Sequence, residues 1–208
     1  INSKEINTLM RTHIQYDELN NGVEFTDTGE FLQHNQKIES FTKWPKGKTW
    51  RNVGYQFLAD VDSYMLLSPD YNKKSDDIKY EQLIFLPVKV NGVIVGGVSA
   101  PLDRKRYMNT EGDWVKNRGL FPFDLTKQLL KSFDKKFVVL VEGPRDAARL
   151  LQANIPALAI LGSKNWTVAK RDLLMTLTGD DLSVVLLFDS DAAGQSASFA
   201  VKNTCKNI

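Results

Sequence analysis

The chain is poor in the residue types that usually hold a zinc ion or form disulfides. It has one cysteine, Cys205, and two histidines, His13 and His34. A single cysteine excludes an internal disulfide and any zinc site built from paired cysteines. No apolar run approaches the length of a membrane helix, so we expect no membrane partner. These absences favour a protein of a reducing, cytoplasmic setting with no zinc in this chain.

The chain also has no large excess of charge of either sign. The formal net charge is +2, with 25% charged and 42% hydrophobic residues. A balance this close to neutral does not by itself indicate nucleic-acid binding, so such a prediction depends on local basic patches. The hydrophobic content is enough for the core of one large or two small domains. The chain begins with Ile1 rather than Met, and we expect it to be a piece of a longer protein.

The front of the chain predicts mixed α and β structure. Apolar residues at helical spacing predict a helix over 1–20, and 61–67 is expected to be a strand. Residues 23–60 show no clear period. The Asn91-Gly92 pair in the centre of an apolar stretch over 82–98 predicts a β-hairpin with a type I′ turn.

From residue 124 the pattern changes to a helix, 124–133, followed by strands and helices in alternation. The expected strands are 137–141, 156–161 and 183–188, and the expected helices are 144–153, 167–177 and 194–206. This alternation predicts an α/β fold with right-handed crossovers and a parallel sheet that carries helices on both faces. We therefore predict two domains, a mixed α+β domain over 1–123 and an α/β domain over 124–208.

Carboxylates follow the first and third of these strands directly. Glu142 ends the apolar run 137–141, and Asp189 and Asp191 end the run 184–188. With the strand order 2-1-3 the three acids share one edge of the sheet, where open α/β sheets place their ligands. Mg²⁺ prefers few carboxylates together with waters and phosphate oxygens. The pattern predicts a magnesium site for a phosphate substrate, with Glu142 as ligand or general base.

Other interpretations of this edge stay open. Asp-x-Asp after a strand is often only a turn with capping carboxylates. An EF-hand calcium loop is a rival, but Ala193 and Ala200 stand where that loop needs ligands. Gly162, after the second strand, is either a plain turn glycine or a point where a phosphate approaches backbone amides.

Three phrases together resemble the TOPRIM domain of primases, topoisomerases and some nucleases. They are Val141-Glu142-Gly143-x-x-Asp146-Ala147, Leu161-Gly162-Ser163 and Phe188-Asp189-Ser190-Asp191-x-Ala193-Gly194. The resemblance implies a TOPRIM Rossmann-like sheet in which Glu142, Asp189 and Asp191 are catalytic and bind Mg²⁺, with Mn²⁺ as a substitute. It gives supporting roles to three further residues, Asp146, Gly143 and Gly162.

The preceding region is similar to the basic subdomain of DnaG-type primases and phage primase-helicases. The predicted hairpin is followed by Arg106-Tyr107-Met108-Asn109-Thr110, then by Lys116 and Leu120-Phe121. The family has a hairpin, a lysine-tyrosine-leucine-asparagine-serine phrase, a lysine and a Leu-Tyr/Phe-Gly close. The resemblance implies that basic residues contact nucleotide or template phosphates, and the candidates are Arg104, Arg106, Lys116, Arg118 and Lys164.

The chain departs from the family pattern in several places. An arginine usually follows the hairpin glycines, and here Arg104 is the nearest substitute. Gln195 stands where primases generally have Arg or Lys. No Asp or Glu occurs after Asp191, so the chain either ends before a further acidic motif, which is the simpler explanation, or lacks that motif. The zinc module of many family members is also missing.

A second basic segment, 43–51, interleaves lysines and an arginine with Trp44 and Trp50. This composition suits the stacking of single-stranded bases on the indole rings. A solvated loop anchored to a core by its tryptophans explains the segment equally well.

The resemblance implies a DNA primase that makes short RNA primers by Mg²⁺-dependent nucleotidyl transfer. Its expected partners are a single-stranded DNA template, ribonucleoside triphosphates and a replicative helicase, fused or separate. Two alternatives stay open: a TOPRIM nuclease, and a non-catalytic single-stranded DNA-binding module derived from a primase. A topoisomerase needs a second domain with an attacking tyrosine, for which the chain has no room. The expected location is the cytoplasm, that of the bacterial host if a phage encodes the chain.

Overall fold

The structure, a computed structural model, describes residues 36–40, 53, 55–69, 80–101, 107–109, 117–133, 136–177 and 182–205. The helix expected over 1–20 lies outside these residues. The chain divides into two compact units, Ile1–Pro87 with Val93–Gly112 and Val88–Gly92 with Asp113–Ile208. The two domains expected from the sequence stay a prediction. Among the helices that the structure describes, none is long and apolar enough to span a membrane.

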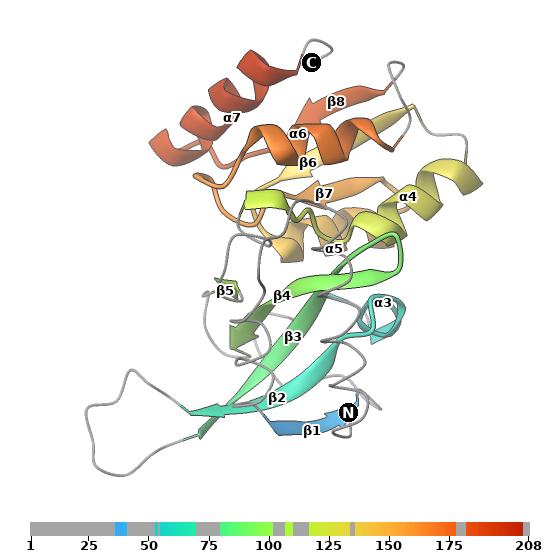
Figure 1. Cartoon of the computed structure of the whole chain (residues 1–208), viewed down its shortest axis with the longest axis vertical. Coiled ribbons are helices and arrows are strands. Elements are labelled where there is room, and N and C mark those ends of the chain that lie inside the picture. Colours follow the sequence, from blue (N-terminus) through green and yellow to red (C-terminus); the bar gives the residue numbers. More distant parts are fainter. Residues whose placement is uncertain are drawn as a thin grey trace. The chain divides into compact units, whose positions relative to one another are not determined.

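A five-stranded sheet with the order β1-β2-β3-β4-β5 dominates the first unit (Figure 1). The pairs β1–β2, β2–β3 and β4–β5 are antiparallel. Helix α3 (Tyr55–Asp60) precedes β2, which starts three residues later than expected because Val61 and Asp62 form a turn. The strands are β1 (Gln36–Ser40), β2 (Tyr64–Pro69), β3 (Tyr80–Val90), β4 (Val93–Pro101) and β5 (Met108–Asn109).

The core of this unit forms around β3 and β4. Residues 83–86 of β3 are buried one after another, so both faces of the strand are covered. Gly97 of β4 makes room for the Phe85 ring, because a Cβ atom at Gly97 would lie 2.1 Å from that ring. Gly97 thus has a packing role, which accounts for the glycine at this position.

The predicted hairpin between β3 and β4 is confirmed, and its turn is clamped. Asn91 and Gly92 have positive φ angles of 53° and 84°, as a type I′ turn requires. Their two backbone N–H groups donate to the Asp124 carboxylate, each over 2.6 Å. Lys127 Nζ donates to Asn91 Oδ1 over 2.7 Å. Asp124 and Lys127 both lie on helix α4 (Phe123–Ser132), so this helix fixes the tip of the hairpin.

The second unit contains a parallel sheet with the order β7-β6-β8, which confirms the predicted order 2-1-3. Its strands are β6 (Phe137–Val141), β7 (Ala157–Ala159) and β8 (Ser183–Leu186), and its helices after α4 are α5 (Pro144–Gln152), α6 (Val168–Met175) and α7 (Ala192–Thr204). In Figure 1, α6 crosses in front of the strands. The predicted fold class, an α/β unit with a parallel sheet after a mixed region, is confirmed.

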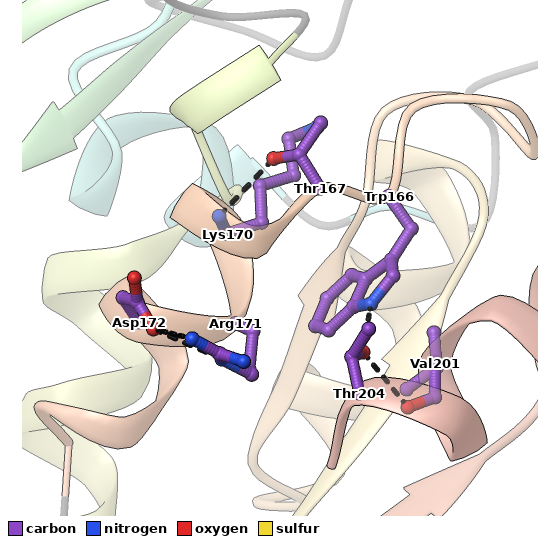
Figure 2. A network of polar contacts seen from close by, with 7 residues as sticks. All are labelled: Trp166, Thr167, Lys170, Arg171, Asp172, Val201 and Thr204. Carbon is purple, nitrogen blue, oxygen red and sulfur yellow. Dashed lines mark hydrogen bonds and ion pairs between the residues drawn. The ribbon is translucent and has the colours of Figure 1, made fainter.

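Hydrogen bonds tie the helices and the preceding segment to this sheet. Phe121 exchanges two backbone hydrogen bonds with Ala159, so the β7 edge is paired. Thr126 Oγ1 of α4 donates to the Ala157 carbonyl over 2.7 Å. Ahead of α6, Trp166 Nε1 donates over 2.8 Å to Thr204 Oγ1 near the end of α7 (Figure 2). These bonds hold α4, the segment before it and the loop between β7 and α6 in place within the unit.

Candidate active site

Glu142 lies directly after β6, the central strand of the parallel sheet. Its side chain is half-buried, and Oε1 accepts a hydrogen bond from the Asp189 N–H over 3.3 Å. Asp189 follows β8, the neighbour of β6 in the sheet. Parallel strands that are neighbours end at the same edge, so the fold itself brings these two acids together.

Asp191 lies at the start of α7 and is its N-cap. Its Oδ1 accepts the Gly194 N–H over 2.8 Å, which satisfies one of the free amides of the first helical turn. The capping interpretation of Asp-x-Asp is therefore correct for one oxygen of Asp191. Gln195 Nε2 donates to the Ser190 carbonyl over 3.0 Å, which fastens the turn between Asp189 and Asp191.

Gly194 lets α7 approach the acids closely. A Cβ atom there would lie 2.0 Å from the Asp189 carbonyl oxygen and 2.7 Å from Glu142 Oε1. Any larger residue would push the start of α7 away from both groups. The glycine therefore belongs to the site as the residue that keeps it compact.

The charges at this edge repel one another. Partial burial raises the pKa of the Glu142 carboxyl, the Asp189 N–H opposes the rise, and the negative charges of Asp189, Asp191 and Asp146 add to it. The net pKa is above the ordinary glutamate value. A bound cation relieves this repulsion, so the electrostatics of the edge favour a positively charged ligand.

The donor set fits magnesium better than a metal that needs many protein ligands. Over the described part of the chain, no group of three or more His, Cys, Asp or Glu side chains is gathered tightly enough to enclose an ion. Mg²⁺ is usually held by one or two carboxylates and completes its shell with waters and substrate phosphates. Glu142 and Asp189, with Asp191 beside them, match that requirement.

The three residues predicted to support the site lie around Glu142. Gly143 is the N-cap of α5, and its carbonyl accepts the N–H of Asp146 over 3.2 Å. The exposed Asp146 carboxylate forms an ion pair with Arg149 over 3.4 Å. The Gly162 N–H donates to the Glu142 carbonyl over 3.2 Å. With a φ of 126°, Gly162 is a turn glycine, and its amide is already used.

Of the residues predicted to contact phosphates or bases, only Lys164 and Arg118 lie in the described part of the chain. Lys164 is exposed in the loop between β7 and α6, and Arg118 lies half-buried before α4. Asn117, the residue before Arg118, accepts a hydrogen bond at its carbonyl from Thr167 Oγ1, the predicted cap of α6. The other candidates lie outside the described residues: Trp44, Trp50, Arg104, Arg106 and Lys116.

Sequence reasoning missed Lys170, a fully buried lysine on α6. Its Nζ donates to the Ile160 carbonyl over 2.6 Å, and burial lowers its pKa to about 7. A signal was present, since positions 170, 174 and 177 fall at helical spacing and are buried, and lysine is the one charged residue among them.

The last third of the chain defines the class of the domain. A family model described as Toprim-like matches residues 139–208, so this part of the chain is a Toprim-like domain, as its motifs predicted. No curated protein matches the sequence.

Solved structures match a larger part of the chain than the family model does. The Aquifex aeolicus primase (zinc-binding and RNA polymerase domains) matches with a TM-score of 0.54 and 21% identity over 72% of this chain. The chain covers 43% of that structure, so it spans less than half of its length. At this level of identity the likeness shows a shared fold.

Two further structures are similar. A bacteriophage T7 structure, of lagging-strand DNA polymerase with primase domains bound to an RNA/DNA hybrid and dTTP, matches with a TM-score of 0.50 and 17% identity. That match covers 81% of this chain and 80% of the other. The RNA polymerase domain of Mycobacterium tuberculosis primase DnaG has a TM-score of 0.48 and 23% identity, over 61% of this chain and 44% of that one.

Proposed function

We propose that this chain is the catalytic core of a DNA primase, which joins ribonucleotides on a single-stranded DNA template. One observation carries the proposal: Glu142, at the end of β6, is bound by the Asp189 N–H and repelled by the charges of Asp189 and Asp191. This arrangement suits a divalent cation that in turn binds phosphate. The RNA/DNA hybrid and dTTP in the T7 structure support a template and a nucleoside triphosphate as ligands.

Glu142, Asp189 and Asp191 would hold Mg²⁺, with Mn²⁺ as a substitute. When bound, the ion would neutralise charge on a nucleoside triphosphate. In the proposed reaction a 3′-hydroxyl attacks the α-phosphate and pyrophosphate leaves. The protein contributes by holding the acidic side chains in place. The cap on the Gly194 N–H holds Asp191 at the start of α7, and the Asp189 N–H holds the Glu142 carboxylate. Such positioning and charge stabilisation supply most of the catalysis in phosphate transfer.

The basic candidates would bind the polyanionic ligands. Lys164 follows Gly162 at the same end of the sheet as Glu142, so its exposed amine suits a contact to nucleotide or template phosphate. This part of the binding would weaken as salt concentration rises. A replicative helicase, fused or separate, is the proposed protein partner, and the cytoplasm is the proposed location, that of a bacterial host if a phage encodes the chain.

The test is template-directed extension of ribonucleotides by the full chain with Mg²⁺ or Mn²⁺. We expect Glu142→Gln to lower the rate about 100-fold or more, because the variant loses the charge that holds the ion or accepts the proton. Single-stranded DNA binding should change little. Asp172→Asn is the matched control, since this carboxylate is exposed on α6 and pairs only with Arg171 among the described residues.

Two results would contradict the proposal. Cleavage of the template without extension, lost in Glu142→Gln, would identify a nuclease that uses the same acids with water as the attacking group. Template binding with neither activity, unchanged in Glu142→Gln, would identify a non-catalytic binding module.

A further inference from the structure

The loop between β7 and α6 has an unusual backbone. Leu161 adopts a left-handed conformation with φ of 64°, and the next residue, Gly162, has φ of 126°. A bulky residue other than glycine is uncommon at positive φ, and its side chain here is also buried. Such strain persists only where surrounding contacts hold it, and it often occurs beside functional groups.

This loop is joined to the backbone of the candidate active site. The Ile160 N–H donates to the Val141 carbonyl over 2.9 Å, and the Gly162 N–H donates to the Glu142 carbonyl over 3.2 Å. The second bond is made by the residue that carries the half-buried carboxylate. The position of the loop and the position of Glu142 therefore depend on each other.

Asn165 and Lys170 also bind the backbone of this loop. Asn165 Nδ2 donates to the Leu161 carbonyl over 2.5 Å, and the Asn165 N–H donates to the Gly162 carbonyl over 2.9 Å. Lys170 Nζ donates to the Ile160 carbonyl over 2.6 Å from the first turn of α6, whose cap, Thr167, accepts the Lys170 N–H (Figure 2). The loop is thus fastened at three consecutive carbonyl groups.

A lysine is an expensive side chain to bury, so its presence needs a reason. Among the described residues the Lys170 amine has no carboxylate partner, and burial lowers its pKa to about 7. An apolar side chain of the same length would pack at less cost. It would leave the Ile160 carbonyl without a donor, although that carbonyl is buried and lies beyond the last pair of β7, Val141↔Ala159.

We propose that Lys170 is a positioning residue for Glu142. By holding the Ile160 carbonyl it fixes the β7–α6 loop, and the Gly162 N–H of that loop holds the Glu142 backbone in place. The inference rests on the proposed function in one respect: it takes Glu142 to be the carboxylate that binds the cation. It adds a residue that touches neither the ion nor the substrate.

The experiment compares Lys170→Met with Lys131→Met, the same change at an exposed lysine on α4. Hydrogen exchange at the Gly162 amide reports on the loop, and the Val139 amide, bonded to Pro156, is the internal reference. We expect Lys170→Met to speed exchange at Gly162 about tenfold or more with little change at Val139. Mn²⁺ affinity, followed by electron paramagnetic resonance, should fall about 10-fold, as outer residues of metal sites commonly show.

A second variant keeps the test decisive if Lys170→Met does not fold. Asn165→Ala loosens the same loop without a change at the buried amine, and it should shift both readouts in the same direction. Wild-type exchange at Gly162 and wild-type Mn²⁺ affinity in either folded variant would overturn the inference. If the wild-type chain binds no Mn²⁺, the proposed function fails, whereas the Gly162 exchange still decides the role of Lys170.

Discussion

Gly194 is the residue at which the site leaves the least room for change. The space of a Cβ atom is taken by the Asp189 carbonyl and by Glu142 Oε1. The residue lies in the first turn of α7 with ordinary helical geometry, so closeness to the acids rather than conformational freedom explains the glycine. The start of this helix is therefore part of the site.

The sign of the change in the free energy of unfolding caused by Gly194→Ala tests this close contact. In a helix, alanine normally stabilises relative to glycine by about 0.5–1 kcal/mol. Here we expect a loss of about 1–3 kcal/mol in the free energy of unfolding, because the methyl group has no space. Mn²⁺ affinity should fall as α7 moves away. Denaturant unfolding measures the first effect, with the exposed Ser196→Ala on the same helix as control. Stabilisation by Gly194→Ala would contradict the close contact.

Lys170 predicts a pH dependence of stability. Its pKa is about 7 in the fold and near the ordinary lysine value of 10.5 in the unfolded chain. Between these values the unfolded chain binds more protons, so the free energy of unfolding rises with pH, by at most about 1.4 kcal/mol per unit. Below pH 7 the fold bears the full cost of the buried charge. Denaturant unfolding from pH 7 to 10 should show a smaller rise for Lys170→Met than for the wild type. Equal slopes would show that the amine stays charged in the fold.

At the scale of elements, α7 and the candidate site share one side chain. Asp191 caps the helix through Oδ1 and contributes negative charge beside Glu142. Removal of Asp191 therefore affects both the helix and the proposed ion, and a single substitution to alanine does not separate them.

A pair of substitutions does separate them. Asp191→Asn keeps an acceptor for the Gly194 N–H, so stability should change by a few tenths of a kcal/mol, whereas Asp191→Ala should lose about 0.5–2 kcal/mol. Both remove the charge, so both should weaken Mn²⁺ binding. Thermal unfolding and Mn²⁺ titration of the two variants give the comparison. If Asp191→Asn binds Mn²⁺ as the wild type does, Asp191 is only a cap.

Whether an element could be predicted from the sequence depended on the strength of its local pattern. Short apolar runs that end in carboxylates are a strong local signal, so the order of β6, β7 and β8 and the meeting of Glu142 with Asp189 could be predicted. Helix α3 and strand β1 escaped prediction because residues 23–60 mix aromatic and polar residues without a period. Helical spacing places Lys170 on the buried side of α6, but its hydrogen-bond partner, the Ile160 carbonyl, is a tertiary contact that no local pattern shows.

At the scale of the whole molecule, each unit has its own buried core. One surrounds β3 and β4, and the other surrounds β6, where Leu140 is fully buried. Units with separate cores are able to unfold in separate steps.

Leu140→Ala tests this independence. The cavity should lower the stability of the second unit by about 2–5 kcal/mol. Native-state hydrogen exchange of the full chain should then speed up at amides of β6, β7 and β8, and much less at amides of β3 and β4. An equal effect in both groups would show that the chain unfolds as one cooperative body.

The hairpin tip has a practical consequence for anyone dividing the protein. Residues 88–92, the end of β3 and the turn, belong to the second unit, although the rest of β3 and all of β4 belong to the first. The polypeptide crosses the border three times, after Pro87, after Gly92 and after Gly112. No single cut yields both halves intact: a fragment that starts at Asp113 leaves the Asp124 carboxylate without the two amides that it binds.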